Sequence, residues 1–303
     1  MKAVVLSVYG DASKLELREV PEPKPGPGQI AVRVAGASLN PIDWKLRSGA
    51  YHAYMPLQLP AILGKDASGE VVEVGSGVTA FTPGMRVLGR VESAYAERVV
   101  GAAEGWAEVP AGLDLTDAAA LPLVALTGAQ LIEEAAGVRE GQRVLVTGAL
   151  GSVGRVAVFV AKARGARVIA GVRAAQKSAA ARLGADEVVG LDDEGDLARL
   201  GELDAIADTV GGAVIAAVLG KVKAGGTVGT VLGEPAGAAA RGLVARTMLT
   251  HPAPKRLAEL ARAVADGKLV VPIAKRFPLA QVAEAHRFAE EGHPAGKVLL
   301  VVG

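Results

Sequence analysis

The segment VLVTGALGSVG, residues 144–154, decides the fold of this chain. A short apolar run leads into a glycine-rich turn, and the pattern after the turn is that of a helix. Gly148, Gly151 and Gly154 give the spacing G-x-x-G-x-x-G, which departs from the strict G-x-G-x-x-G pattern because position 149 is alanine. A strand that runs through such a turn into a helix is typical of dinucleotide-binding sites.

Each part of this turn has a physical reason in such a site. At Gly151 the backbone can approach a pyrophosphate, and Gly154 permits close packing of the helix on the strand. The N–H groups of Ser152 and Val153, at the start of the helix, would hold the anion. The alternative, a turn that needs glycine for its backbone alone, is less consistent with the strand before it and the helix after it.

Strands and helices alternate from residue 143 onward, which predicts a doubly wound α/β domain with a parallel sheet. The predicted strands are near-continuous apolar runs, as expected of a sheet that is covered on both faces. These strands are RVLVTG (143–148), RVIAGV (167–172), DEVVG (186–190), LDAIADTV (203–210) and GGTVGTVLG (225–233). Helices are predicted between them, for example over residues 152–165 and 176–184.

The two ends of the chain have a different character. Short strands separated by proline- and glycine-rich turns predict a β-rich domain over residues 1–115. Thr116 is expected to cap a helix that runs to about Gly137. Residues 258–303 offer a short strand, a helix and a last strand, whose natural place is in the first domain. We therefore expect one domain from 1–115 and 258–303, with residues 116–257 inserted as the second domain.

Composition excludes several classes of function. The 303 residues carry a net charge of +1, which gives no electrostatic case for nucleic acid or an acidic membrane. There is no cysteine, so disulfides, thiolate nucleophiles and cysteine-ligated metals are excluded. No apolar run reaches the roughly 20 residues of a membrane span, and the first residues do not have the pattern of a signal peptide. We expect a cytoplasmic protein.

The residues after the second strand indicate which dinucleotide binds. NAD sites usually carry an acidic residue about 20 residues after the glycine turn, which bonds the ribose 2′-hydroxyl. No Asp or Glu occurs from Gly141 to Ala185. Arg173 and Lys177 are instead placed to meet a 2′-phosphate. The alternative is that both are solvated surface charges; the missing acid favours NADPH.

Several stretches together resemble the medium-chain dehydrogenase/reductase superfamily, and within it the zinc-independent quinone oxidoreductase (zeta-crystallin-like) branch. They are ASLNPIDWKLRSG, LPAILGKDASGEVVEVGSGVTAFTPGMRVLG, AALPLVALTGAQ, VTGALGSVG, DTVGG and GHPAGKVLLVV. The resemblance covers nearly the whole chain. It implies a GroES-like catalytic domain built from both chain ends, an inserted Rossmann domain, a cofactor in the cleft between them, and a homodimer. The candidate edge strand for dimerisation is VARTML, residues 244–249.

The zinc enzymes of this superfamily bind catalytic zinc through a Cys after the third strand and a His in a G-H-E turn. Here these positions read Asn40 and Gly64-Lys65-Asp66, and His52, His251, His286 and His293 have no ligand spacing. The resemblance therefore implies a metal-free reductase. Lys65 either stabilises negative charge on a substrate oxygen or pairs with a neighbouring carboxylate and holds the turn.

The resemblance also assigns further residues. Asn40 is expected to donate to a substrate oxyanion, and Tyr51 to line the pocket or donate a proton. Trp44 either stacks on a flat acceptor or anchors the core. Tyr54 is a candidate for the wall of the substrate pocket, and the alternative for it is simple apolar packing. The expected cofactor contacts are Thr127 at the carboxamide, Leu232 and Gly233 at the nicotinamide ribose, and Lys297 at the cleft rim.

Together these features predict hydride transfer from NADPH to a quinone or an α,β-unsaturated carbonyl compound. Two alternatives stay open from the sequence. One is an enoyl-thioester reductase that acts on a carrier-bound substrate by the same chemistry. The other is a non-catalytic nucleotide-binding or structural protein.

Overall fold

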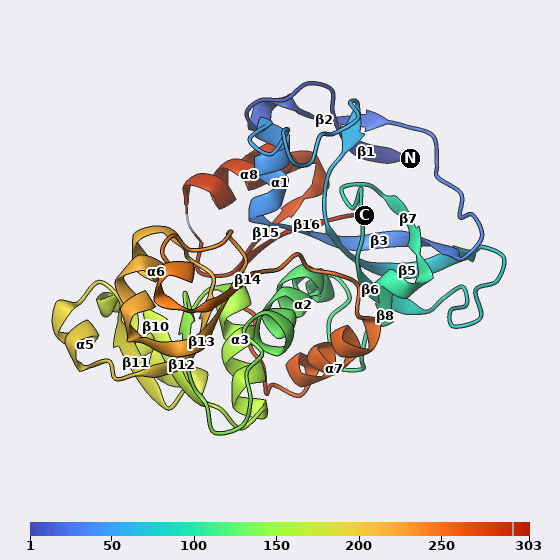
Figure 1. Cartoon of the computed structure of the whole chain (residues 1–303). Coiled ribbons are helices and arrows are strands. Elements are labelled where there is room, and N and C mark those ends of the chain that lie inside the picture. The colour runs from blue at the N-terminus through green and yellow to red at the C-terminus, as the bar shows by residue number, and fades with distance from the viewer. Residues whose placement is uncertain (293) are drawn as a thin grey trace. The chain divides into compact units, whose positions relative to one another are not determined.

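The computed structural model describes residues 1–292 and 294–303, which form two compact units (Figure 1). Unit 1 contains residues 1–123 and 252–303, and unit 2 contains residues 124–251. We expected the divisions after residues 115 and 257. Residues 117–120 belong to unit 1 because this short 3-10 helix packs on β3, β5 and β16, and because Asp117 pairs with Arg276 at 2.7 Å.

The β-strands of unit 1 come from both ends of the chain. They are β1 (Lys2–Leu6), β2 (Leu15–Glu19), β3 (Gln29–Leu39), β4 (Ala61–Ile62), β5 (Asp66–Val74), β6 (Arg86–Arg90), β7 (Arg98–Ala102), β8 (Trp106–Glu108), β15 (Ile273–Pro278) and β16 (Lys297–Val301). The helices are α1 (Pro41–Ser48), α7 (Pro254–Ala265) and α8 (Val282–Glu291).

One large sheet of unit 1 has the order β15-β16-β3-β5-β6-β8, with β7 also paired to β3. β16 runs antiparallel to β3, with Val298 opposite Leu39, so the late strands complete a sheet begun early in the chain (Figure 1). This confirms that the C-terminal segment returns to the β-rich domain. A smaller sheet has the order β2-β1-β4. Alternate residues of these strands, such as Val32 and Val34, enter one apolar core.

Unit 2 is the doubly wound domain that the glycine-rich turn predicts. Its strands are β9 (Arg143–Thr147), β10 (Arg167–Val172), β11 (Glu187–Gly190), β12 (Leu203–Asp208), β13 (Val222–Thr230) and β14 (Val244–Thr247). All pairs are parallel, in the order β11-β10-β9-β12-β13-β14. The strand order reverses between β9 and β12, and ligands of such sheets bind at the carboxyl ends of the strands at this point. The helices include α3 (Ser152–Ala163), α4 (Lys177–Ala180), α5 (Glu194–Arg199) and α6 (Gly212–Val218).

The helix expected from Thr116 is not one element. A 3-10 helix (Asp117–Ala120) is followed by α2 (Pro122–Gln130) and a π-helical turn (Leu131–Ala135). Thr116 has helical backbone angles and makes no capping bond; Asp114 accepts from the backbone N–H of Asp117 instead, at 3.0 Å. The capping prediction was wrong by two residues. Pro122 lacks an N–H group, so a new helix begins there.

Candidate functional site

The glycine-rich turn of unit 2 has the geometry of an anion site. β9 ends at Thr147, Gly148 has a φ of +64°, and α3 begins at Ser152. A Cβ atom on Gly154 would lie 2.1 Å from the carbonyl oxygen of Gly148, so only glycine allows α3 to pack this closely on the turn. A Cβ atom on Gly151 would meet a single atom, at 3.1 Å.

The residues present fit a dinucleotide pyrophosphate. α3 is 12 residues long, and its first turn carries no acidic side chain. The backbone N–H groups of Ser152 and Val153 stand at the positive end of the helix dipole, where backbone donors have no partner within the helix. The turn is fixed beside β10, because Ala149 N donates to the carbonyl oxygen of Gly171 at 3.1 Å.

A buried carboxylate that the sequence did not single out braces the strand ends around this turn. Asp208, at the end of β12, accepts from the hydroxyls of Thr147 at 2.7 Å and Thr230 at 3.0 Å. It also accepts from the backbone N–H groups of Val210 and Gly211. The stretch DTVGG was noticed only as a family motif. Its Asp ties β9, β12 and β13 together where the order of the strands reverses.

Asp208 also lines a cavity of about 460 Å³ inside unit 2. Leu232 and Gly233, expected at a nicotinamide ribose, line the same cavity, and 48% of the Leu232 surface is exposed. Thr127 is mostly buried, and its hydroxyl lies 2.6 Å from the hydroxyl of Thr250. A carboxamide contact by Thr127 would have to share or replace that hydrogen bond.

The two basic residues after β10 differ in their ion pairing. Arg173 is exposed, and within residues 1–292 and 294–303 its guanidinium forms no ion pair. Lys177 donates to Asp196 at 2.6 Å, and Asp196 also accepts from Arg199 at 2.6 Å. These contacts, the Lys177 hydrogen bond above all, hold the pKa of Asp196 well below its usual range. The sequence did not indicate this partner, which comes from α5, 19 residues further along the chain. A phosphate contact by Lys177 stays a prediction, and it would have to share or replace this ion pair.

In unit 1, the turn Gly64-Lys65-Asp66 is tightly constrained. Gly64 has a φ of +101°, and a Cβ atom there would lie 2.6 Å from the Tyr95 ring. Lys65 is mostly buried, and its ammonium pairs with the carboxylate of Glu92. Of the two interpretations of Lys65, the structure contains the ion pair with a neighbouring carboxylate.

Asp66 and Asn40 belong to a buried polar cluster with Lys297. Asn40 Nδ2 donates to Asp66 at 2.8 Å, and Asn40 Oδ1 accepts from Lys297 Nζ at 2.6 Å. The other Asp66 oxygen accepts from the backbone N–H of Leu123, in the first turn of α2, at 2.7 Å. Lys297 also donates to the carbonyl oxygen of Leu39 at 2.9 Å. Burial lowers the pKa of Lys297, and the charges of Asp66 and Asp43 partly offset that effect.

The structure changes the expectations for Lys297 and Asn40. Lys297 does not lie at a rim: it is only 5% exposed, because β16 pairs with β3 and brings its first residue beside the end of that strand. Asn40 is 1% exposed, and its amide donates to Asp66 rather than pointing to an open site. The sequence held no signal for this cluster, since its members are 26 to 257 positions apart.

Asp43 and Tyr95 form a second buried polar pair beside the cluster of Asn40, Asp66 and Lys297. Asp43 accepts from the backbone N–H of Asn40 at 2.8 Å, and burial raises the pKa of Asp43 to about 7. Its other oxygen and the Tyr95 hydroxyl are buried without a hydrogen-bond partner among the described residues. Burial, reinforced by the charge of Asp43, raises the pKa of Tyr95 well above 10. The ring of Tyr95 meets that of His286 edge-on, with 5.8 Å between centroids.

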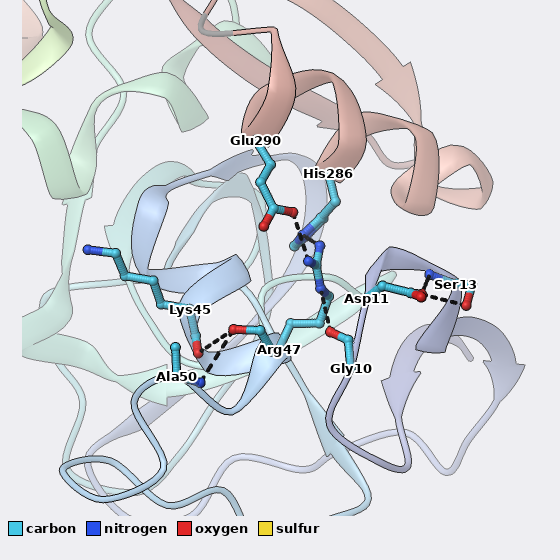
Figure 2. Close-up of polar contacts among 9 residues, drawn as sticks. Gly10, Asp11, Ser13, Lys45, Arg47, Ala50, His286 and Glu290 are labelled. Atoms are coloured by element: carbon cyan, nitrogen blue, oxygen red, sulfur yellow. Dashed lines mark hydrogen bonds and ion pairs between the residues drawn. The ribbon is translucent and has the colours of Figure 1, made fainter.

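His286 and Arg47 tie α8 to α1 and the N-terminal turn. Figure 2 shows the Arg47 guanidinium reaching His286 and Glu290 of α8 and the carbonyl oxygen of Gly10. The distances are 3.0 Å to His286 Nδ1 and 2.8 Å to Glu290. Burial, and then the neighbouring Arg47 charge, lowers the pKa of His286 to about 3. This histidine is a neutral structural group.

The aromatic candidates of unit 1 lie in different surroundings. Tyr51 and Trp44 are half-buried and pack against the core. The Tyr51 hydroxyl lies 3.2 Å from Lys45 Nζ, a neighbour that the sequence analysis did not identify. Tyr54 is 84% exposed, so it is not packed in the core, and its ring stands T-shaped to that of Tyr51 with 6.4 Å between centroids. Its place in a substrate pocket stays a prediction. His52 bonds the Tyr9 hydroxyl at 3.1 Å.

Comparison with known proteins identifies the family. Residues 26–111 match the model of the alcohol dehydrogenase GroES-like domain, and residues 183–300 match that of the zinc-binding dehydrogenases. Acryloyl-coenzyme A reductase of Metallosphaera sedula is 30% identical over 99% of this chain and 99% of its own length. The chain belongs to the medium-chain dehydrogenase/reductase superfamily.

Solved structures place it in the quinone oxidoreductase branch of that superfamily. The quinone oxidoreductase of Coxiella burnetii has a TM-score of 0.90 and 30% identity, covering 100% of this chain and 99% of that one. Escherichia coli quinone oxidoreductase in complex with NADPH has a TM-score of 0.85 and 27% identity, covering 99% and 100%. The protein is thus an oxidoreductase of this branch.

At the two positions that the resemblance assigns to catalytic zinc, this chain has Asn40 and Lys65. Among residues 1–292 and 294–303, no group of three or more His, Cys, Asp or Glu side chains could hold a metal ion. His293 lies outside the described residues. In the same part of the chain, no helix is long and apolar enough to span a lipid bilayer.

Proposed function

We propose that this protein reduces a quinone or an α,β-unsaturated carbonyl compound with NADPH, and that it does so without catalytic zinc. The observation that carries this proposal is the Gly148–Gly154 turn, whose free backbone donors at the start of α3 fit a pyrophosphate. The similarity to quinone oxidoreductases, one of them in complex with NADPH, supports it. Lys65 and Asn40 at the two expected zinc positions support the metal-free part.

In this proposal the backbone of Ser152 and Val153 binds the pyrophosphate, and Arg173 binds the 2′-phosphate. Leu232 and Gly233 border the nicotinamide ribose. The bound cofactor supplies two electrons and one proton as a hydride, and the acceptor needs one more proton. We assign that proton to Tyr51: Lys45 donates to its oxygen, so the hydrogen of the Tyr51 hydroxyl remains available to an acceptor.

Asn40, Asp66 and Lys297 act as positioning residues in this proposal. All three are buried: Asn40 is hydrogen-bonded to both Asp66 and Lys297, which form an ion pair at 3.7 Å. Asp66 also accepts from the backbone N–H of Leu123 in the first turn of α2. The cluster fixes the junction between β3 and α1, the helix that carries Trp44, and the junction between β4 and β5, which carries Lys65. Preorganised supports of this kind keep reacting groups within narrow tolerances.

The similarity to acryloyl-coenzyme A reductase favours a second acceptor class, enoyl thioesters. The chemistry would be the same, because a thioester carbonyl also accepts negative charge when hydride adds to its conjugated double bond. We further propose a cytoplasmic homodimer that joins through β14, the outer strand of the unit 2 sheet.

The test is consumption of NADPH, with NADH as control, against a panel of a benzoquinone, a naphthoquinone, a simple enone and an enoyl thioester. Turnover of quinones or enones supports the proposal, and turnover of the thioester alone moves the assignment to the second class. Binding of NADPH without turnover of any acceptor would refute the catalytic proposal and favour a non-catalytic role. Tyr51→Phe should lower kcat by roughly 10²-fold.

Lys65 is tested with Glu92 as its matched partner. If the ammonium acts on a substrate oxygen, Lys65→Met lowers kcat strongly and Glu92→Gln, which frees the charge, raises it. If the ion pair only holds the turn, both variants lower the melting temperature and leave kcat/KM within about threefold. We expect the second result, because the structure already gives Lys65 a carboxylate partner.

A further inference from the structure

The loop after β11 brings a carboxylate to the end of β10. Asp192 accepts a hydrogen bond from the backbone N–H of Ala174 at 2.6 Å, and Leu191 N donates to the carbonyl oxygen of Val172 at 2.7 Å. Ala174 directly follows Arg173. An acidic side chain therefore lies one residue from the position that we assign to recognition of the 2′ substituent, although it comes from the next strand along the chain.

That position is fixed relative to the glycine-rich turn. In dinucleotide-binding domains, the group that bonds the ribose 2′ substituent follows the second strand, about 20 residues after the turn. Here the second strand is β10, Arg173 follows it, and the turn is held beside β10 by the bond from Ala149 N to Gly171. The carboxylate of Asp192 is anchored to the same short loop.

The nearby positive charges are already paired and do not help Arg173 to bind a 2′-phosphate. Lys177 and Arg199 both pair with Asp196, so neither ammonium nor guanidinium is available without breaking an ion pair. Asp196 is itself fixed by the backbone N–H of Gly190 at 2.9 Å. A 2′-phosphate, which carries nearly two negative charges at pH 7, would meet one unpaired Arg and one exposed carboxylate.

We propose that Asp192 is a specificity-determining residue that weakens the binding of 2′-phosphorylated dinucleotides and lets this enzyme use NADH as well as NADPH. Its carboxylate repels a 2′-phosphate but can accept a hydrogen bond from a free ribose 2′-hydroxyl. The inference rests on the nicotinamide-dinucleotide site of the proposed function, and it concerns only the choice between the two cofactors.

The test uses Asp192→Asn, which keeps the oxygen that accepts from Ala174 and removes the charge. Calorimetry would measure the Kd of adenosine 2′,5′-bisphosphate and of 5′-AMP, which differ only in the 2′-phosphate. We expect the bisphosphate to bind about fivefold to tenfold more tightly to the variant, and 5′-AMP to bind equally or slightly more weakly. The gain should shrink in about 0.5 M salt, because the repulsion is screened. The ratio of kcat/KM for NADPH over NADH should rise by a similar factor.

Glu194→Gln is the matched control, since Glu194 is an exposed carboxylate two residues further along that makes no hydrogen bond to the β10 loop among the described residues. An equal gain in Glu194→Gln would overturn the proposal, because the effect would then be one of net charge. An unchanged bisphosphate-to-AMP ratio in a folded Asp192→Asn variant would also overturn it while leaving the dinucleotide site intact. If neither nucleotide binds any form of the protein, the proposed dinucleotide site is wrong and this inference falls with it.

Discussion

Asp66→Asn should be among the most destabilising isosteric substitutions in unit 1. Asp66 is fully buried and accepts at both oxygens, from Leu123 N on one and from Ser38 Oγ and Asn40 Nδ2 on the other. An asparagine must point its own NH₂ group at one of these donors, whichever way it is turned. The substitution also removes the carboxylate charge that pairs with the ammonium of Lys297.

The expected loss of stability follows from the distance between Lys297 and Asp66. Lys297 Nζ lies 3.7 Å from Asp66 Oδ2, and at that separation an attraction of roughly 4.5 kcal/mol is lost at an effective dielectric constant of about 20. Breaking one side of a buried ion pair typically costs about 3–5 kcal/mol, and we expect a loss in that range. Lys297→Met should be costly too. The double variant should lose about 1–3 kcal/mol less than the sum of the single variants.

The assay is urea unfolding followed by tryptophan fluorescence. Both tryptophans, Trp44 and Trp106, lie in unit 1, so the signal reports the unit that contains the substitution. Glu70→Gln is the matched control: it lies in the same strand and pairs with Arg33 at 2.8 Å on the surface, where such a pair contributes less than about 1 kcal/mol. A loss in Asp66→Asn no larger than that of Glu70→Gln would refute the reasoning.

Three further predictions concern unit 1 and the assembly. Gly64→Ala should cost more than about 2 kcal/mol in the same unfolding assay, because the φ of +101° is strained for alanine and the Tyr95 ring occupies the space for its Cβ atom; an unfolding midpoint equal to that of the unsubstituted protein would contradict this. The pH profile of stability should contain two opposed contributions. Asp43, with its pKa raised from 3.8 to about 7, holds more protons in the folded state and makes stability fall as the pH rises through that window. His286, with its pKa lowered from 6.5 to about 3, holds fewer and makes stability rise between those values. In Asp43→Asn the free energy of unfolding should therefore increase from about pH 4 to 6, by up to roughly 1.4 kcal/mol per pH unit, whereas in His286→Gln it should decrease. Unfolding series at several pH values measure both profiles, and parallel profiles for the two variants would show that the two contributions are not opposed. Finally, light scattering should give the mass of a dimer, and a charged substitution in residues 244–249 should yield monomers; a monomer mass for the unsubstituted protein would end the homodimer proposal.

The sequence predicted the fold well because its main signals are local. Apolar runs of the right length gave the strands of unit 2, and Gly148, Gly151 and Gly154 marked the turn at which the strand order reverses. The return of the last strand to the first domain was also predicted, because the alternation of strands and helices stops before it, and β16 does pair with β3. Helix boundaries were less accurate: Thr116 was chosen as a cap, although Asp114 makes the bond.

The polar contacts could not be predicted, because they join residues that have no fixed spacing. Lys65 with Glu92, Lys177 with Asp196, and Asn40 with Lys297 are separated by 27, 19 and 257 positions. The stretch without Asp or Glu ends at Ala185, and Asp192 follows only after the next strand, β11. Only the pairing of β10 with β11 shows that the two loops meet.

The interleaved order of the two units has a consequence for synthesis on the ribosome. Unit 2 is one continuous segment, and its last strand has left the ribosome when residue 247 emerges. Unit 1 can complete its main sheet only later, because β16 pairs with β3 across more than 250 residues. The ammonium of Lys297 likewise pairs with the carboxylate of Asp66, which emerged far earlier. Until residues 297–301 appear, the edge of β3 and the charge of Asp66 have no partner from β16, which makes the nascent first unit a natural client for chaperones.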